Sequence, residues 1–103
     1  MSVQELDAKG FEDETANGKW IIDFWASWCG PCKKMDPIFE DVADEVDGIQ
    51  FGSLNIEEHQ ETAAELGVRS IPAFLYIEDG EVKDRTMGAM SREDFQDWVE
   101  NKA

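Results

Sequence analysis

The seven residues from Trp20 to Ala26, WIIDFWA, constrain the fold more than any other part of this sequence. They are bulky and nearly all apolar, and Asp23 is the one carboxylate among them. A strand that is apolar at successive positions leaves no face for water, so it suits a sheet that is covered on both sides. This stretch therefore predicts an internal strand with helices packed on both faces of its sheet.

The rest of the chain alternates between helical and extended patterns. We expect helices over residues 6–16, 29–47, 57–66 and 92–101, and further strands over 49–56, 73–77 and 81–87. Asp79-Gly80 predicts a two-residue hairpin turn, because both residues tolerate positive φ, and Ser91 suits a helix N-cap. Pro37 should kink the second helix. The order predicts an α/β fold with a central mixed sheet flanked by helices on both faces.

Length and composition fit one folded unit. The chain has 103 residues, the size of one ordinary domain, so we expect a single domain over residues 1–103. Apolar residues make up 42%, and six Phe and four Trp supply bulk for a core, which argues against a disordered chain.

The charge is strongly acidic. Nine Lys and Arg stand against 24 Asp and Glu, for a net charge of −15. Such a surface repels phosphate backbones and anionic lipid heads, which argues against nucleic-acid and peripheral membrane binding. Two explanations for the acidity stay open: adaptation to high salt, and ordinary solubility with steering of partners.

The N-terminal residues MSVQELD have neither a basic region nor an apolar one, so we expect no signal peptide. The longest apolar stretch is interrupted by Asp23 and is far shorter than the ~20 residues of a membrane span. A secreted disulfide scaffold normally carries four or more cysteines, whereas this chain has two. We therefore expect a cytoplasmic protein.

The two cysteines, Cys29 and Cys32, follow the apolar strand and open the helix predicted after it. A thiol at a helix N-terminus is close to unpaired amide donors, which stabilise the thiolate, the nucleophile of disulfide exchange. The three-residue spacing puts both thiols on one face of the first turn. Gly30 adds a permissive backbone and Pro31 a preset φ. The motif predicts a redox pair in which one thiol attacks a disulfide and the other releases the product.

Two other interpretations of the cysteine pair remain. Cys-x-x-Cys also occurs in zinc sites, which need four ligands or three plus water, and His59 is the single histidine in the chain. A structural disulfide is the second alternative, although closing so small a loop adds little stability. The position between strand and helix favours the redox pair over both.

The sequence resembles the thioredoxin family from about Phe11 to Val99. The most specific part is IIDFWASWCGPCKKMDP, supported by RSIPAFLYIEDGEV and MGAMS. The Gly-Pro between the cysteines is similar to that of the general disulfide-reducing members. Glutaredoxins typically have Pro-Tyr there, and oxidases or isomerases typically have a His. The resemblance implies a thioredoxin fold.

The resemblance also implies roles for single residues. Cys29 would be the exposed attacking thiol and Cys32 the more buried resolving thiol. Trp28 would pack over the disulfide and meet clients. With Gly30 and Pro31 of the motif, three further residues would border the client: Ile71 and Pro72, which match a cis-proline loop, and Gly88, which matches a loop of small residues.

Asp23 matches the buried aspartate with which family members take up or relay the proton of the resolving cysteine. From the sequence alone, burial in an apolar strand should raise its pKa toward neutrality. A structural hydrogen bond would be the plainer explanation for an isolated aspartate, but the adjacent cysteine pair favours the functional one. Ser53 stands where many thioredoxins have a lysine near this aspartate. The pKa of Asp23 should therefore lie higher than it would beside the lysine.

Together these features predict a thiol–disulfide oxidoreductase that reduces client-protein disulfides and is re-reduced by a separate thioredoxin reductase. We expect a monomer without a bound cofactor, because the cysteines carry the electrons and no glycine-rich nucleotide motif is present. Two alternatives remain: a binding module with incidental cysteines, and a disulfide oxidase or isomerase. The intact cysteine pair beside Asp23 argues against the first, and the Gly-Pro spacer against the second.

Overall fold

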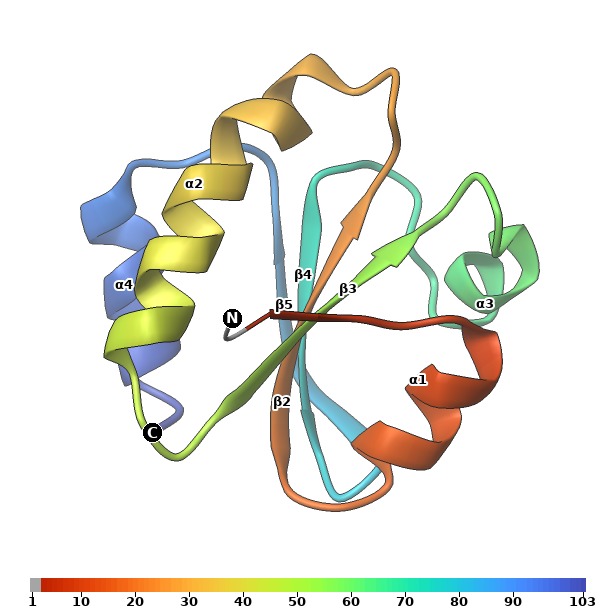
Figure 1. Ribbon diagram of the computed structural model, residues 1–103, viewed down its shortest axis with the longest axis horizontal. Helices are drawn as coiled ribbons and strands as arrows, with labels where there is room; N and C mark the ends of the chain where they lie inside the picture. The colour runs from red at the N-terminus through yellow and green to blue at the C-terminus, as the bar shows by residue number, and fades with distance from the viewer. Residues whose placement is uncertain (1–2) are drawn as a thin grey trace.

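Strand β2 (Lys19–Trp25) is the central strand of the sheet in this computed structural model, which describes residues 3–103 (Figure 1). It pairs in parallel with β3 (Gln50–Asn55) and antiparallel with β4 (Ala73–Glu78). Its five inner residues, 20–24, are all buried. The prediction of an internal strand is confirmed, since both edges of β2 are hydrogen-bonded and both faces are covered.

Five strands form one mixed sheet in the order β1-β3-β2-β4-β5. β1 (Val3–Glu5) runs parallel to β3, and β5 (Glu81–Met87) runs antiparallel to β4. The turn between β4 and β5 is the predicted one, with φ of 50° at Asp79 and 83° at Gly80. Asp79 also accepts a hydrogen bond from Gly18 N at 2.8 Å, which ties this turn to the one before β2.

Helices cover both faces of the sheet (Figure 1). On one face lie α2 (Gly30–Glu45) and α4 (Arg92–Glu100), over a cluster that includes four phenylalanines. On the other lie α1 (Ala8–Thr15) and α3 (Gln60–Glu65), over a mainly aliphatic cluster. The predicted α/β class, a central mixed sheet flanked by helices on both faces, is therefore confirmed.

Helix ends follow the predicted capping. The Ser91 hydroxyl accepts a hydrogen bond from Asp94 N at 3.1 Å at the start of α4. α2 begins immediately after Cys29 and continues through Pro37 as one helix. Continuation is possible because the missing proline donor removes only one backbone bond.

Two expectations about element bounds were wrong. β1 was not expected, because its sequence VQE has one apolar residue and its hydrogen bonds depend on β3, about fifty residues later. The helix expected over residues 57–66 begins at Gln60, and residues 56–58 form a turn instead. In that turn Asn55 Oδ1 accepts from Glu57 N at 2.8 Å, a side-chain bond that competes with the first helical turn. His59 is accordingly the N-cap of α3 and not a residue within it.

Candidate active site

Cys29 and Cys32 form a disulfide where β2 ends and α2 begins, with their Cα atoms 5.3 Å apart. Cys29 is the N-cap of α2, and its sulfur accepts a hydrogen bond from Cys32 N at 3.2 Å. Pro31 lies in the first turn, where a missing N–H donor costs nothing. The sequence-predicted placement of both sulfurs at a helix N-terminus is confirmed, and this environment stabilises a thiolate on Cys29 once the disulfide is reduced.

Both cysteines are buried in the disulfide. Cys29 is 4% exposed and Cys32 is 2% exposed, so the exposed attacking thiol implied by the family resemblance is not what this state shows. The reason is packing, because both cysteines cluster with Ala26 and against the side chains of Ile56 and Ile71. A client disulfide can therefore reach Cys29 only through the small part of its surface that this packing leaves exposed.

Two tryptophans flank the cysteines in different ways. Trp28 was expected to pack over the disulfide, but it is 69% exposed and projects into solvent. Trp25, for which the sequence predicts no role in the site, packs against the cysteine cluster. The two residues lie in different elements, because Trp25 is the last residue of β2 and Trp28 lies in the loop beyond it. No pattern in the sequence identifies Trp25 as a neighbour of the disulfide.

The loop before β4 lies beside the disulfide. Ile71 packs against the cysteines, and the Ile71–Pro72 peptide bond is cis, as the resemblance implied. The carbonyl of Pro72 accepts a hydrogen bond from Gly88 N at 2.8 Å, which fastens this loop to the end of β5. Gly88 has a φ of +92°, a conformation that favours glycine. Exposed Met87, 52% accessible, adds an apolar side chain next to Gly88.

Asp23 is buried inside β2, with 3% of its surface exposed. Its Oδ1 atom has no hydrogen-bond partner in the part of the chain that the structure describes. Burial, followed by the negative charge of Asp36, raises the pKa of Asp23 to about 8. The sequence prediction of a raised pKa is confirmed in direction, and such a carboxyl can exchange protons near neutral pH.

A small cavity of about 160 Å³ adjoins Asp23. Ser53 lines it from β3, where it is the register partner of Asp23, and Asp36 and Glu40 line it from α2. Trp25 also lines it, so the same indole borders both the cavity and the cysteine cluster. Sequence reasoning identified Ser53 as an unusual neighbour of Asp23 but missed Asp36, which follows the motif by four residues.

A second carboxylate, Glu57, holds the loop that precedes Cys29. One oxygen of Glu57 accepts hydrogen bonds from both Ser27 N and Ser27 Oγ, the latter at 2.6 Å. These bonds, and one from the backbone N–H of Trp28, hold the pKa of Glu57 below its ordinary value. The contact spans thirty residues, so no local pattern in the sequence indicated it.

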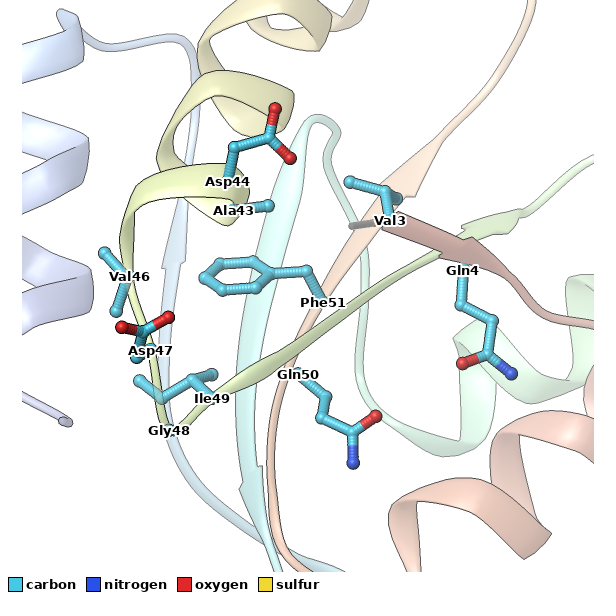
Figure 2. Close-up of a pocket in the computed structure, with 10 residues that line it drawn as sticks. All are labelled: Val3, Gln4, Ala43, Asp44, Val46, Asp47, Gly48, Ile49, Gln50 and Phe51. Atoms are coloured by element: carbon cyan, nitrogen blue, oxygen red, sulfur yellow. The ribbon is translucent and has the colours of Figure 1, made fainter. Parts of the chain in front are cut away.

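Other features of the described residues carry less chemistry. Figure 2 shows a groove between the last turns of α2 and strands β1 and β3, with Phe51 pointing toward the helix. It is lined from the end of α2 that lies away from the cysteines. Within residues 3–103, no group of three or more His, Cys, Asp or Glu is arranged to hold a metal ion. No helix among those residues is long and apolar enough to cross a membrane.

Comparisons with known proteins agree on one family. A family model described as Thioredoxin matches residues 2–101. A curated thioredoxin of Bacillus subtilis (strain 168) is 38% identical over 100 residues, which cover 96% of each chain. One from Rickettsia typhi is 41% identical over 80 residues, 77% of this chain and 76% of the relative.

A solved structure gives the same result for the fold. A mutant thioredoxin from Halobacterium salinarum NRC-1 superposes with a TM-score of 0.88 at 26% identity. The match covers 97% of this chain and 89% of the solved chain.

Proposed function

This chain belongs to the thioredoxin family and is a thiol–disulfide oxidoreductase, and we propose that Cys29 attacks client disulfides, Cys32 resolves them and Asp23 accepts the proton of Cys32. The observation that carries this proposal is the position of the Cys29 sulfur. It caps α2 and accepts the amide hydrogen of Cys32, so its thiolate is the stabilised one of the pair.

The exchange has two steps. The Cys29 thiolate attacks one sulfur of the client disulfide, a new bond forms between them, and the other client sulfur leaves as a thiolate that takes up a proton. The Cys32 thiol then gives its proton to Asp23 in those molecules whose Asp23 carboxyl is ionised, a fraction that grows as the pH approaches the raised pKa of about 8. The Cys32 thiolate attacks the Cys29 sulfur, which forms the Cys29–Cys32 disulfide and releases the second client thiolate. Two electrons pass from the cysteine pair to the client.

The surface around the disulfide supplies the client site in this proposal. Trp28 and Met87 offer exposed apolar side chains at its rim. Ile71, Pro72 and Gly88 form the adjoining loops, and Gly30 with Pro31 begins α2 beside them. No atom would crowd a side chain at Gly30 within 4 Å, so a client backbone has room to approach there.

Membership of the family implies two kinds of partner, disulfide-bearing clients and a thioredoxin reductase that restores the thiols. We propose further that the protein acts as a cytoplasmic monomer, binds neither nucleic acid nor membrane, and needs no bound cofactor. The net charge of −15 supports the exclusion of polyanionic partners.

A trapping experiment tests the roles of the two cysteines. Reduced Cys32→Ser protein, mixed with insulin as a disulfide substrate, should accumulate a mixed disulfide through Cys29. Cys29→Ser should form none and lose nearly all reductase activity. Trapping by Cys29→Ser and not by Cys32→Ser would reverse the assignment.

The reduction potential of the pair tests the direction of the chemistry. The known value for thioredoxin is about −270 mV, and oxidising relatives lie at roughly −180 to −120 mV. We expect a value near the first, measured by equilibration with a dithiol buffer and followed by tryptophan fluorescence, since Trp25 packs against the cysteines. A value ~100 mV higher would make the protein an oxidant or isomerase.

A further inference from the structure

The cavity beside Asp23 contains charge of one sign. Asp36 and Glu40 reach it from α2, and Asp23 reaches it from β2. The remaining side chains that line it are Val3, Trp25, Phe39 and Ser53, so no lysine or arginine is among the described lining residues. Among these described residues, the carboxyl of Asp23 therefore has no cation in the cavity to balance it.

Within residues 3–103, the strands paired with β2 place no charged residue opposite Asp23. Its register partner on β4 is Phe74, and its partner on β3 is Ser53. β1 contributes Val3 to the cavity, and Cys32 on α2 is held in the disulfide and does not titrate. Asp36 and Glu40 are thus the titratable groups that share a space with Asp23.

Asp23 and Asp36, which line the same cavity, differ in solvent access. Asp23 is buried and its Oδ1 lacks a partner, whereas Asp36 is exposed to solvent. An exposed carboxyl ionises first, and its charge then opposes ionisation of the buried one. The raised pKa of Asp36, caused by partial burial and then by Glu40, shows the same crowding of negative charge.

We propose that Asp36 is a positioning residue that acts through Asp23: its carboxylate, across the shared cavity, holds the Asp23 carboxyl in the acid form. Asp23 then loses its proton at a higher pH than it would without Asp36. The lysine that many thioredoxins have at the position of Ser53, as the resemblance implies, would act in the opposite direction. The consequence for catalysis rests on the proposed role of Asp23 as proton acceptor, whereas the titration that tests the inference does not depend on that role.

The test is a titration of the Asp23 side chain by carbon-13 NMR in the oxidised protein, where the cysteines do not titrate. Asp36→Asn should lower the midpoint of Asp23 by roughly half a pH unit, the order expected of one partly screened like charge. Asp36→Lys should lower it further, and Asp36→Glu should leave it nearly unchanged.

Glu12→Gln is the matched control, because it removes the same charge from the exposed side of α1, on the opposite face of the sheet. If Asp36→Asn shifts the midpoint no more than Glu12→Gln does, the inference is wrong. If the midpoint shifts but the pH profile of mixed-disulfide resolution does not follow, Asp36 acts on Asp23 as inferred. In that case the proposed proton transfer from Cys32 to Asp23 fails.

Discussion

Asp23 and Glu57 flank the same active-site segment, one inside the sheet and one at the surface, and their surroundings move their pKa values in opposite directions. Asp23 is 3% exposed, its Oδ1 has no partner among the described residues, and its pKa is raised to about 8. Glu57 is exposed, accepts two hydrogen bonds from Ser27, and has a lowered pKa.

Burial and hydrogen-bond donors, and not the residue type, decide whether each of these carboxyls favours its neutral or its ionised form. Desolvation without a donor favours the neutral acid, whereas donors at an exposed site favour the carboxylate. One fold therefore places a buried carboxyl with a raised pKa in β2 and an exposed carboxylate with a lowered pKa against the loop before Cys29. Substitutions and salt that change burial, charge or hydrogen bonding at either carboxyl should therefore change the two sides of the active site differently.

The largest effect should come from Asp23→Asn, which replaces the buried titratable carboxyl with an amide that stays neutral at every pH. Asp23 has a folded-state pKa of about 8, above its unfolded value of ~3.9, so the native protein binds an extra proton between these values. Wild-type stability should fall as pH rises through this window, and the Asn variant should escape that loss. We expect it to be more stable by roughly 4 kcal/mol at pH 7, with the gap closing near pH 4.

Urea denaturation at several pH values measures this gap, with Glu12→Gln as the control for removal of one exposed charge. An Asn variant that is less stable than wild type at pH 8 would show that the Asp23 carboxyl is paired in solution.

A smaller effect is expected from Ser53→Lys, which gives Asp23 a cationic neighbour at its register position on β3. The added charge favours the carboxylate, so the pH that governs deprotonation of Cys32 should fall, by roughly one unit. The pH–rate profile of mixed-disulfide resolution measures the change, and Ser53→Ala separates charge from size. An unchanged profile for the lysine variant would count against electrostatic control of Asp23.

Added salt should weaken the repulsion among exposed carboxylates and leave the burial of Asp23 unchanged. At ~1 M salt the Debye length is about 3 Å, which screens repulsion among surface carboxylates but not the burial of Asp23. If self-repulsion from the net charge of −15 is significant, Tm should rise by roughly 4–8 °C from low salt to ~1 M. A flat thermal response would remove salt adaptation as the explanation for the acidity.

The smallest effect should come from Glu57→Gln, which keeps a hydrogen-bond acceptor but removes its charge. Exchange of the Ser27 amide hydrogen should become about two- to threefold faster, because charge-assisted bonds are stronger than neutral ones. Since the pKa of Glu57 is lowered, the wild-type bonds persist below the ordinary Glu range and are lost as pH falls through the lowered value. The two proteins should therefore converge in acid, and Glu61→Gln, an exposed neutralisation on α3, should show no such change.

Much of the site could be predicted because its signals are local. The apolar run of β2, the turn at Asp79-Gly80 and the cysteines at the start of α2 each depend on residues within a few positions of one another. The cis bond before Pro72 came from family resemblance, since nothing in its neighbouring residues distinguishes it. The contact of Trp25 with the disulfide was missed, because it depends on the direction in which the last strand residue points.

By itself the sequence determined the element order and the pairing of two thiols at a helix N-terminus, since period, capping and spacing act over one or two turns. Only the tertiary structure decided the strand order β1-β3-β2-β4-β5, the bond between Glu57 and Ser27, and the acidic cavity at Asp23. The physical reason is distance along the chain. Burial, missing partners and crowded charge are created when segments far apart in sequence pack together, so their effect on a pKa cannot be obtained from either segment alone.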